Sequence, residues 1–218
     1  MPLLSVIVRC SNEKRAGTLR EALVSVLSIK LDEFECIVVC DGLNDRLRLV
    51  AEGMNDDRFV FISSGRRIGR AAACNLGIQR SSGYYLSYLD DDDLYTEDGI
   101  KYLINYCLWT GSRFVYGESG EPGIRRASEG LLGGNFIHNC EVVHERSLFS
   151  DVGMFDTALW VMEDWDMWLR FEGVSPPVYV PKFVSTVRYD MATRRGELHQ
   201  GPRWDRAKKR IMGKWKHE

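Results

Sequence analysis

This chain of 218 residues lacks the segments that place a protein in or across a membrane. No stretch approaches the roughly 18 consecutive uncharged residues that a transmembrane helix needs. The apolar N-terminus, residues 1–9, is too short for a signal peptide and has neither a basic start nor a cleavage site. We therefore predict a cytoplasmic location, because such a protein stays in the compartment where it is made.

Paired cysteine motifs and a large charge excess are also missing. The six cysteines include no CxxC pair, which argues against a zinc ribbon or a thioredoxin-type site. Several lie in apolar runs, where reduced thiols behave as small buried hydrophobic groups. The formal net charge of −2 is too balanced for wholesale nucleic-acid binding, so we expect no nucleic-acid partner.

What the chain does contain is an alternation of apolar strands and helical patterns. The predicted strands are residues 3–8, 34–39, 59–63, 84–89, 113–116, 141–144, 178–180 and 184–189, and the main helices are 19–27, 47–54, 70–79, 97–109, 163–171 and 204–215. Uninterrupted apolar strands separated by helices favour an α/β fold whose mostly parallel sheet is covered on both faces. Ligands of such sheets bind where the strands end.

Two boundaries need separate mention. Thr96 has the residue type and position of an N-cap for the helix that follows it. Residues 117–134 carry six glycines, a proline and mixed charge, which is typical of an irregular surface loop. We expect that loop to help shape the site of a second substrate.

Two acidic clusters, Asp90 to Asp93 and Glu163-Asp164, follow apolar or aromatic stretches. Adjacent carboxylates repel one another unless a cation, hydrogen bonds or a helix start compensates them. Carboxylates at a strand end can bind Mg²⁺ or Mn²⁺ and leave coordination positions for phosphate oxygens. The second cluster fits helix capping or a carboxylate that accepts a proton.

Two known kinds of acidic metal-binding site, the EF-hand and the response-regulator receiver domain, do not fit the spacing of these acids. An EF-hand that begins at Asp90 would need a ligand and a glycine where Leu94 and Tyr95 stand. A response-regulator receiver domain carries its acid pair after the first strand, where this chain has Arg9 and Cys10.

Five motifs in the same order resemble glycosyltransferase family 2, whose members have the GT-A fold. They are residues 4–8, 35–42, 68–78, 88–93 and 163–170. Each motif alone is weak evidence for the family, but five in the same order are specific to it. The resemblance covers about residues 3–189. It implies one GT-A domain over 1–218, with a nucleotide-sugar half at 1–93 and an acceptor half at 94–218.

The resemblance also implies roles in binding the donor. Asp41 would hold the nucleotide base, and Arg70 would lie near the base or the diphosphate. Asp90, with Asp91 beside it, would face the ribose. Asp92 would be the direct ligand of Mn²⁺ or Mg²⁺, with Asp90 as a second ligand. The family most often uses UDP-sugars, which makes a UDP-sugar the first donor to test.

The resemblance further implies an inverting, single-displacement reaction. Asp164 would be the base that removes a proton from an acceptor hydroxyl as its oxygen attacks the anomeric carbon of the sugar. A hexose or deoxyhexose would pass to a glycan, protein-linked or lipid-linked acceptor. No covalent enzyme intermediate is required.

Some positions depart from the family pattern. Arg9 and Cys10 stand where a small polar pair is usual, while Cys40 and Leu43 replace an acid and a serine around Asp41. Arg9 fits a contact to base or phosphate as well as it fits a surface position. Residues 187–191 lack the histidine that many relatives carry there, and His199, farther along, fits either a weak contact to the metal or diphosphate or a solvated loop.

Two alternative functions have sequence arguments against them. A sugar-nucleotide nucleotidyltransferase needs a glycine-rich loop after the first strand, and residues 10–15 contain no glycine. A catalytically silent nucleotide-sugar-binding module would not require Asp92 and Asp164, which are both present.

The C-terminal segment and the tryptophans leave alternatives open. Residues 203–218 form a basic amphipathic pattern that fits either peripheral membrane contact or a helix that covers the domain. Trp160, Trp165 and Trp168 could form a platform for a sugar ring, although core packing is the better prediction for at least two of them.

Overall fold

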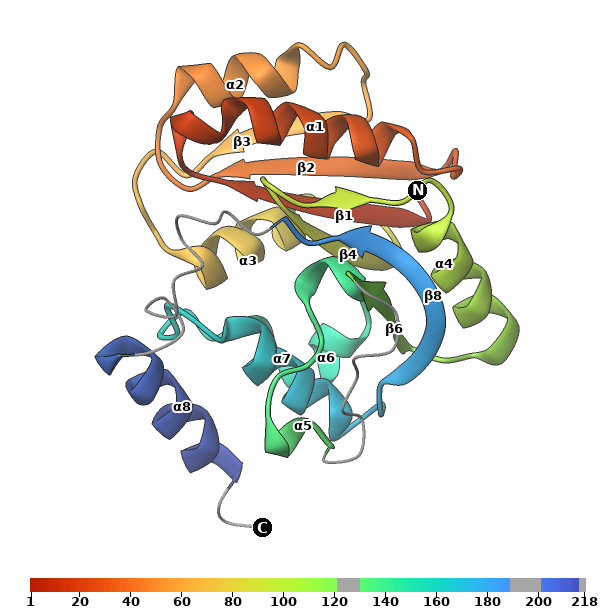
Figure 1. Ribbon diagram of the computed structural model, residues 1–218, viewed down its shortest axis with the longest axis vertical. Coiled ribbons are helices and arrows are strands. Elements are labelled where there is room, and N and C mark those ends of the chain that lie inside the picture. The colour runs from red at the N-terminus through yellow and green to blue at the C-terminus, as the bar shows by residue number, and fades with distance from the viewer. Residues whose placement is uncertain (121–129, 189–200, 216–218) are drawn as a thin grey trace.

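An eight-stranded sheet runs through the molecule, with helices on both of its faces (Figure 1). The computed structural model describes residues 1–120, 130–188 and 201–215. The strands are β1 (Leu4–Cys10), β2 (Phe34–Cys40), β3 (Phe59–Ser63), β4 (Tyr85–Asp90), β5 (Leu94–Tyr95), β6 (Phe114–Ser119), β7 (Val142–Glu145) and β8 (Val178–Thr186). The helices are α1 (Ala16–Leu27), α2 (Asp45–Glu52), α3 (Arg70–Arg80), α4 (Gly99–Thr110), α5 (Gly130–Gly133), α6 (Leu148–Val152), α7 (Glu163–Glu172) and α8 (Pro202–Trp215), with 3-10 turns η1 (Glu13–Arg15) and η3 (Asn139–Glu141).

The strand order is β3-β2-β1-β4-β7-β6-β8-β5. The β3, β2, β1 and β4 strands are parallel, β7 pairs antiparallel with both β4 and β6, and β8 runs parallel to β6. The short β5 pairs antiparallel with the curved β8 (Figure 1). The predicted α/β sandwich, mostly parallel with a smaller antiparallel portion, is confirmed.

Both faces of the sheet are buried, because successive side chains of a strand point to opposite faces. Along β1, Val6 and Val8 join a core with α1, α2 and α4, whereas Ile7 joins a second core with α3, α7 and α8. All seven residues of β1 are buried. The six cysteines are buried and none forms a disulfide, as expected for reduced thiols.

The carboxyl ends of the parallel strands meet at one edge of the sheet. In the register of β1 with its two neighbours, Arg9 lies opposite Asp90 and Cys10 lies opposite Cys40. The end of β1 therefore places a basic side chain directly beside the first residue of the acidic run.

Two glycines fix helix α3 against this edge. Gly69 precedes the helix with φ +92°, a conformation that side chains rarely adopt. Gly77 faces the sheet so closely that a Cβ there would lie 2.6 Å from Ile7 Cγ2 and 3.0 Å from Val39 Cγ2. The close contact holds Arg70, the first residue of α3, at the sheet edge.

Three local predictions were wrong. Thr96 does not cap α4, because its N–H and hydroxyl bond to carbonyls of β8 and the helix starts only at Gly99. Residues 178–186 form one strand rather than two. Gly117 belongs to β6, where a Cβ would lie 2.7 Å from the Lys182 carbonyl oxygen, so this glycine permits two backbones to approach.

The predicted helix at the C-terminus is α8, and it covers the domain. Its Ala207 and Ile211 are buried in the second core, with Met212 and Trp215 packed against it. The apolar side of α8 is thus occupied within the molecule. Among the described residues, no helix is long and apolar enough to cross a bilayer.

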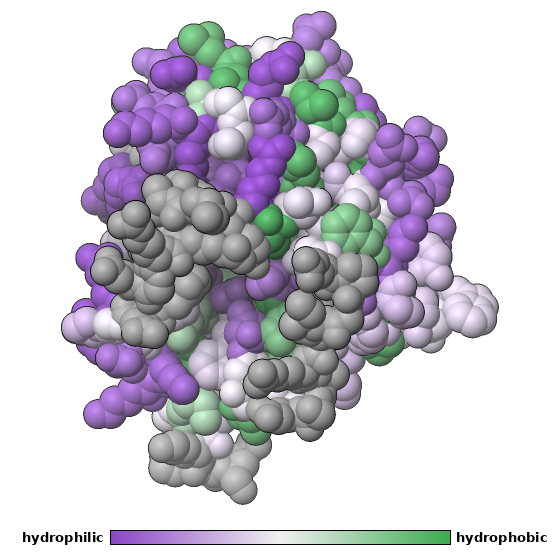
Figure 2. Space-filling view, in the orientation of Figure 1, coloured by the Kyte–Doolittle hydropathy of each residue, from purple (hydrophilic) through white to green (hydrophobic). Residues whose placement is uncertain are grey.

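Core packing is confirmed for two of the three tryptophans. Trp165 and Trp168 are buried, whereas Trp160 is 61% exposed. On the face drawn in Figure 2, apolar residues are scattered among hydrophilic ones. Isolated exposed apolar side chains are normal on a protein surface.

We predict opposite effects of two glycine-to-alanine changes in helices. Gly77→Ala should lower the free energy of unfolding by ~1 to 3 kcal/mol, because its methyl group would overlap Ile7. Gly17→Ala in α1 should raise it by ~0.5 to 1 kcal/mol, because the added Cβ would meet no atom within 4 Å beyond its chain neighbours and the helix's own backbone. Urea unfolding measures both, and equal effects would contradict the close α3 contact.

Candidate active site

A network of four charged side chains joins four elements at the sheet edge. Arg9 of β1 pairs with Asp90 of β4 and, at 3.0 Å, with Glu163 of α7. Arg70 of α3 reaches the same two acids, at 3.3 Å from Asp90 Oδ2 and 3.1 Å from Glu163 Oε1. We call Arg9, Arg70, Asp90 and Glu163 the arginine–carboxylate network.

Two members of the network are buried, with Arg9 9% and Glu163 2% exposed, whereas the side chains of Asp90 and Arg70 are 30% and 48% exposed. Burial on its own lowers the pKa of Arg9, but the adjacent acidic groups, with Asp90 foremost, and the hydrogen bond to Asp90 together raise that pKa above its ordinary value. Burial likewise raises the pKa of Asp90, yet Arg9 and Arg70 bring it below its ordinary value. The guanidinium and carboxylate forms therefore stabilise each other.

The other acids of the run have different partners. Arg15, at the end of η1, lies 2.9 Å from Asp91 Oδ1 and 3.1 Å from Asp92 Oδ2. Burial raises the pKa of Asp91 to about 6, against the opposing effect of Arg15. Burial and the Asp90 charge raise the pKa of Asp93 to about 7, and Asp93 accepts a hydrogen bond from the Arg188 N–H at 2.9 Å. Asp93 thus anchors the segment that directly follows β8.

Asp41 holds the loop that leads into α3. Its carboxylate accepts hydrogen bonds from the N–H of Ile68 at 2.6 Å and of Gly69 at 3.2 Å, and it is 6% exposed. Because Arg70 follows directly, Asp41 positions that arginine. The structure shows this positioning contact; the base-binding role of Asp41 stays a prediction.

Asp164 lies in the first turn of α7. It accepts hydrogen bonds from Asn135 Nδ2 at 3.0 Å and from the Trp165 N–H at 2.8 Å. Burial, with the neighbouring Glu163 charge, raises the pKa of Asp164 from 3.8 to about 6. Such a carboxyl is a stronger base than an ordinary aspartate.

Asp164 borders a cavity of about 380 Å³, which we call the Asp164 cavity. Its lining residues are Arg70, Gly134, Asn135, His138, Met162, Glu163, Asp164, Trp165, Trp204 and Lys208. Arg70 and Glu163 belong to the network as well, so the cavity adjoins the acidic edge of the sheet. A second substrate in this space would meet Asp164 beside the charged groups that suit a diphosphate.

The donors for a metal ion centre on Asp92. Within the described ranges, no group of three or more His, Cys, Asp or Glu side chains is arranged to hold a metal. Both oxygens of Asp90 bond to arginines, whereas Asp92 contacts one arginine of the described chain, Arg15, through Oδ2 and is 20% exposed. Since Mg²⁺ is commonly held by one or two carboxylates together with substrate phosphates, Asp92 fits such a site better than Asp90 does. His199 lies outside the described residues.

Sequence reasoning missed three members of this site. Glu163 was considered only as part of an acid pair, Arg15 only as part of a loop without glycine, and Asn135 not at all. A general signal existed for Glu163 and Arg15, because a buried acid needs a nearby cation. Nothing in the sequence spacing indicates which arginine meets which acid.

Residues 5–133 match the family described as Glycosyl transferase family 2, which is more than half of the chain. The chain belongs to this family. It is 30% identical over 194 residues to an uncharacterized glycosyltransferase of Rickettsia typhi, a match that covers 80% of this chain and 60% of that protein. The chain therefore spans about 60% of the length of this relative.

Solved structures share the fold. A mannosyltransferase from Pyrobaculum calidifontis, in complex with GDP-Man and Mn²⁺, aligns with a TM-score of 0.78 at 17% identity, over 100% of this chain and 65% of its own. TarS of S. aureus in complex with UDP aligns with a TM-score of 0.70 at 17% identity, over 87% and 61%. These matches support the predicted GT-A fold of this family 2 domain.

We predict that Arg9→Met strongly destabilises the domain, because the buried Glu163 and the partly buried Asp90 then keep only Arg70 as an ion-pair partner. The free energy of unfolding in urea should fall by ~3 to 5 kcal/mol. Arg48→Met is the matched control, since Arg48 pairs with Asp45 and Glu52 on the surface of α2, and it should cost less than ~1 kcal/mol. A loss as small as that of the control would contradict the buried network.

Proposed function

We propose that this domain transfers a sugar from a nucleotide-sugar to an acceptor hydroxyl with inversion at the anomeric carbon. The observation that carries the proposal is the position of Asp164. It is a carboxyl of raised pKa, held by Asn135, in a cavity that adjoins the charged carboxyl end of the sheet. A base and a diphosphate-binding edge are the two parts that such a reaction needs.

In the proposed reaction, Asp164 accepts the proton of the acceptor hydroxyl while the hydroxyl oxygen bonds to the anomeric carbon. The bond from that carbon to the diphosphate oxygen breaks, and its electron pair leaves with the nucleoside diphosphate. The sugar has oxocarbenium character between these events. The hydrogen bond from Asn135 keeps the Asp164 carboxylate in one orientation for this proton transfer.

The leaving diphosphate would lie near Arg70, which forms part of both the cavity wall and the network. Its guanidinium can donate hydrogen bonds to phosphate oxygens as negative charge develops there. Asp92 is the carboxylate that we propose as the ligand of Mn²⁺ or Mg²⁺. When bound, the ion would supply further positive charge to the leaving group.

The donor proposal starts from UDP-sugars. The TarS structure contains UDP, and the Pyrobaculum enzyme contains GDP-Man with Mn²⁺, which supports a nucleotide-sugar donor and a divalent cation for this domain. Buried Asp41 is next to the loop that would receive the base, although its oxygens already bind backbone N–H groups.

Asp164→Asn should remove transfer and spare donor binding, because the amide cannot accept the proton. We expect the release of UDP from a UDP-sugar, measured with a panel of oligosaccharide acceptors, to slow by about 10²- to 10⁴-fold. The affinity for UDP should stay within about twofold of the wild type. Asp45→Asn on the α2 surface controls for the loss of one acid. Transfer that survives in Asp164→Asn would refute the assignment of the base.

The same assignment fixes the sign of the pH dependence. The base works only when it is ionised, and the pKa of Asp164 is raised to about 6. The rate should therefore fall as the pH drops through about 6 and stay level above it. An ordinary aspartate would keep the rate constant down to about pH 4.

Asp92→Asn should remove the effect of Mn²⁺ on nucleotide binding. Wild-type protein should melt at a higher temperature with UDP and Mn²⁺ together than with UDP alone, since binding to the folded state stabilises it. Asp92→Asn should lose that difference, and Asp98→Asn at the start of α4 should keep it. Parallel scans with dTDP and GDP identify the base, and an unchanged Mn²⁺ effect in Asp92→Asn would rule out its metal role.

A further inference from the structure

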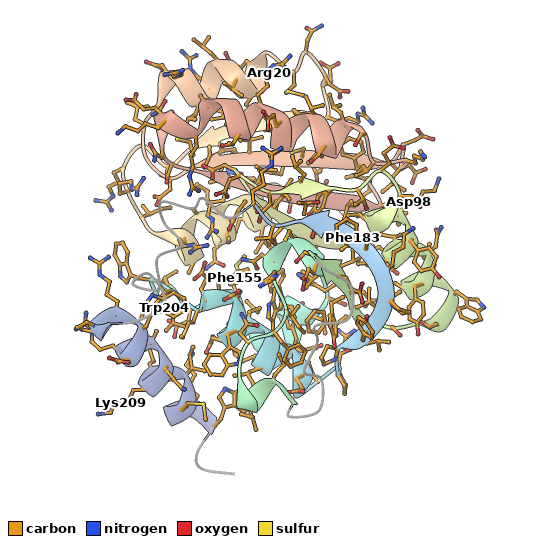
Figure 3. All side chains as sticks on the ribbon, viewed as in Figure 1. Arg20, Asp98, Phe155, Phe183, Trp204 and Lys209 are labelled. Atoms are coloured by element: carbon orange, nitrogen blue, oxygen red, sulfur yellow. The ribbon has the colours of Figure 1, made fainter. Side chains whose placement is uncertain are left out.

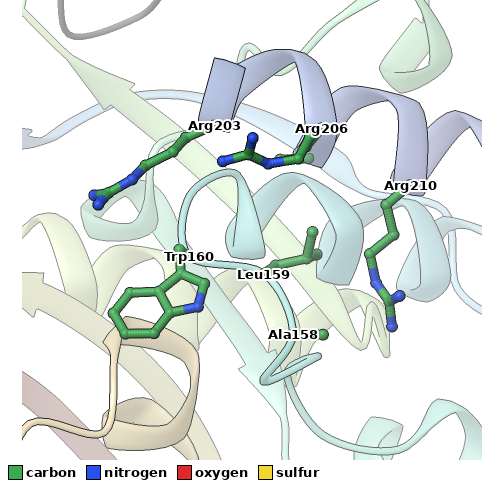
Figure 4. Close-up of a pocket in the computed structure, with 7 residues that line it drawn as sticks. Ala158, Leu159, Trp160, Arg203, Arg206 and Arg210 are labelled. Atoms are coloured by element: carbon green, nitrogen blue, oxygen red, sulfur yellow. The ribbon is translucent and has the colours of Figure 1, made fainter. Parts of the chain in front are cut away.

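A second cavity, of about 330 Å³, lies between α8 and the segment before α7 (Figure 4). Its lining residues are Ala158, Leu159, Trp160, Arg203, Arg206, Ala207 and Arg210. Figure 4 shows the three arginines descending from one helix over the segment that carries Trp160. None of these lining residues belongs to the arginine–carboxylate network or is one of the two hydrogen-bond partners of Asp164 described above.

The positive charge of this cavity is only partly compensated. Arg210 is held by Asp156, with Nε 2.9 Å from Oδ2, so its side chain is fixed in place. Arg203 and Arg206 are exposed, and neither forms an ion pair with any residue that the structure describes. Two guanidinium groups therefore keep their donors available for an anion.

Trp160 supplies the apolar part of the same cavity. It is 61% exposed, in contrast to the buried Trp165 and Trp168. One edge of its ring lies near Gly69, whose added Cβ would be 3.7 Å from Trp160 Cζ3. The exposed remainder of the indole is surface that the apolar C–H groups of a sugar ring can cover.

The cavity lies beside the proposed reaction site. Gly69, against which Trp160 packs, is followed by Arg70 of the Asp164 cavity. The two cavities also share α8, because Trp204 and Lys208 line the Asp164 cavity while Arg203 and Arg206 line this one. A chain of sugar units that reached Asp164 could extend into this second cavity.

We propose that this cavity is an acceptor subsite for an anionic glycan. A sugar unit packs on Trp160, and its phosphate or carboxylate group binds Arg203 and Arg206. This inference rests on the proposed function, because it assigns the cavity to the acceptor. It goes beyond that function in naming the charge of the acceptor.

The test measures binding rather than transfer. UDP and Mn²⁺ are present at saturation so that the proposed donor site is occupied. The probes are glucose, glucose 6-phosphate, glucuronate and inorganic phosphate at equal ionic strength, and saturation-transfer NMR measures the binding of each. The wild type should bind glucose 6-phosphate and glucuronate at least about tenfold more tightly than glucose, which is the scale of one charge-assisted hydrogen bond.

Variants assign each part of the site. Arg203→Gln/Arg206→Gln should lose about tenfold or more of the affinity for both anionic sugars. Trp160→Leu should weaken glucose 6-phosphate binding and leave phosphate binding unchanged. The control Lys101→Gln/Lys209→Gln removes the same charge elsewhere, since Lys209 points away from the molecule (Figure 3), and should bind like the wild type. Urea unfolding confirms that each variant is folded.

Other outcomes overturn the proposal. Equal binding of glucose and glucose 6-phosphate would exclude an anionic subsite. Anionic sugars that bind only in a parallel titration without UDP and Mn²⁺ would belong to the donor site. Phosphatidylglycerol vesicles form a separate arm. Binding to vesicles but to neither anionic sugar would mean a membrane-surface site instead. Asp164→Asn should keep the sugar binding, so failure of the catalytic assignment can be told apart from failure of the subsite.

Discussion

The buried guanidinium of Arg9 is the contact on which the rest of the site depends. It lies at the end of β1, beside Asp90 of β4 in the sheet register, and reaches Glu163 at the start of α7. Three segments far apart in the sequence are joined by one side chain. Burying a charge away from water is costly. Loss of Arg9 or of an acid that it pairs with would therefore leave a buried charge without its partner.

That contact also decides how the four consecutive acids are used. Asp90 is neutralised by Arg9 and Arg70, Asp91 and Asp92 face Arg15, and Asp93 holds the backbone of Arg188. Electrostatic repulsion within the run is thus relieved mainly by arginines of the chain itself. In the proposed reaction Arg70 also contacts the leaving diphosphate, so the donor and Asp90 would share its positive charge.

The fold was predictable because its signal is repeated along the chain. Apolar strands such as residues 4–8 and 34–39 are continuous, and that pattern requires a sheet covered on both faces. Errors arose where a single residue had two possible uses. Thr96 has the chemistry of a helix cap, but pairing of β5 with β8 delays the helix by two residues. Gly117 suggested a loop, although a neighbouring strand explains it better.

The sequence by itself determined the order of the motifs, the placement of acids at strand and helix ends, and hence the family. Those features are local, because they depend on residue type and spacing along one segment. Only the tertiary structure decided that Arg15 faces Asp91 and Asp92, that Asn135 holds Asp164, and that Trp160 stays exposed beside Arg203 and Arg206. Such pairings depend on how distant segments pack. In the sequence many arginines are equally suitable partners for each acid, and only the packing of the fold decides which one lies beside it.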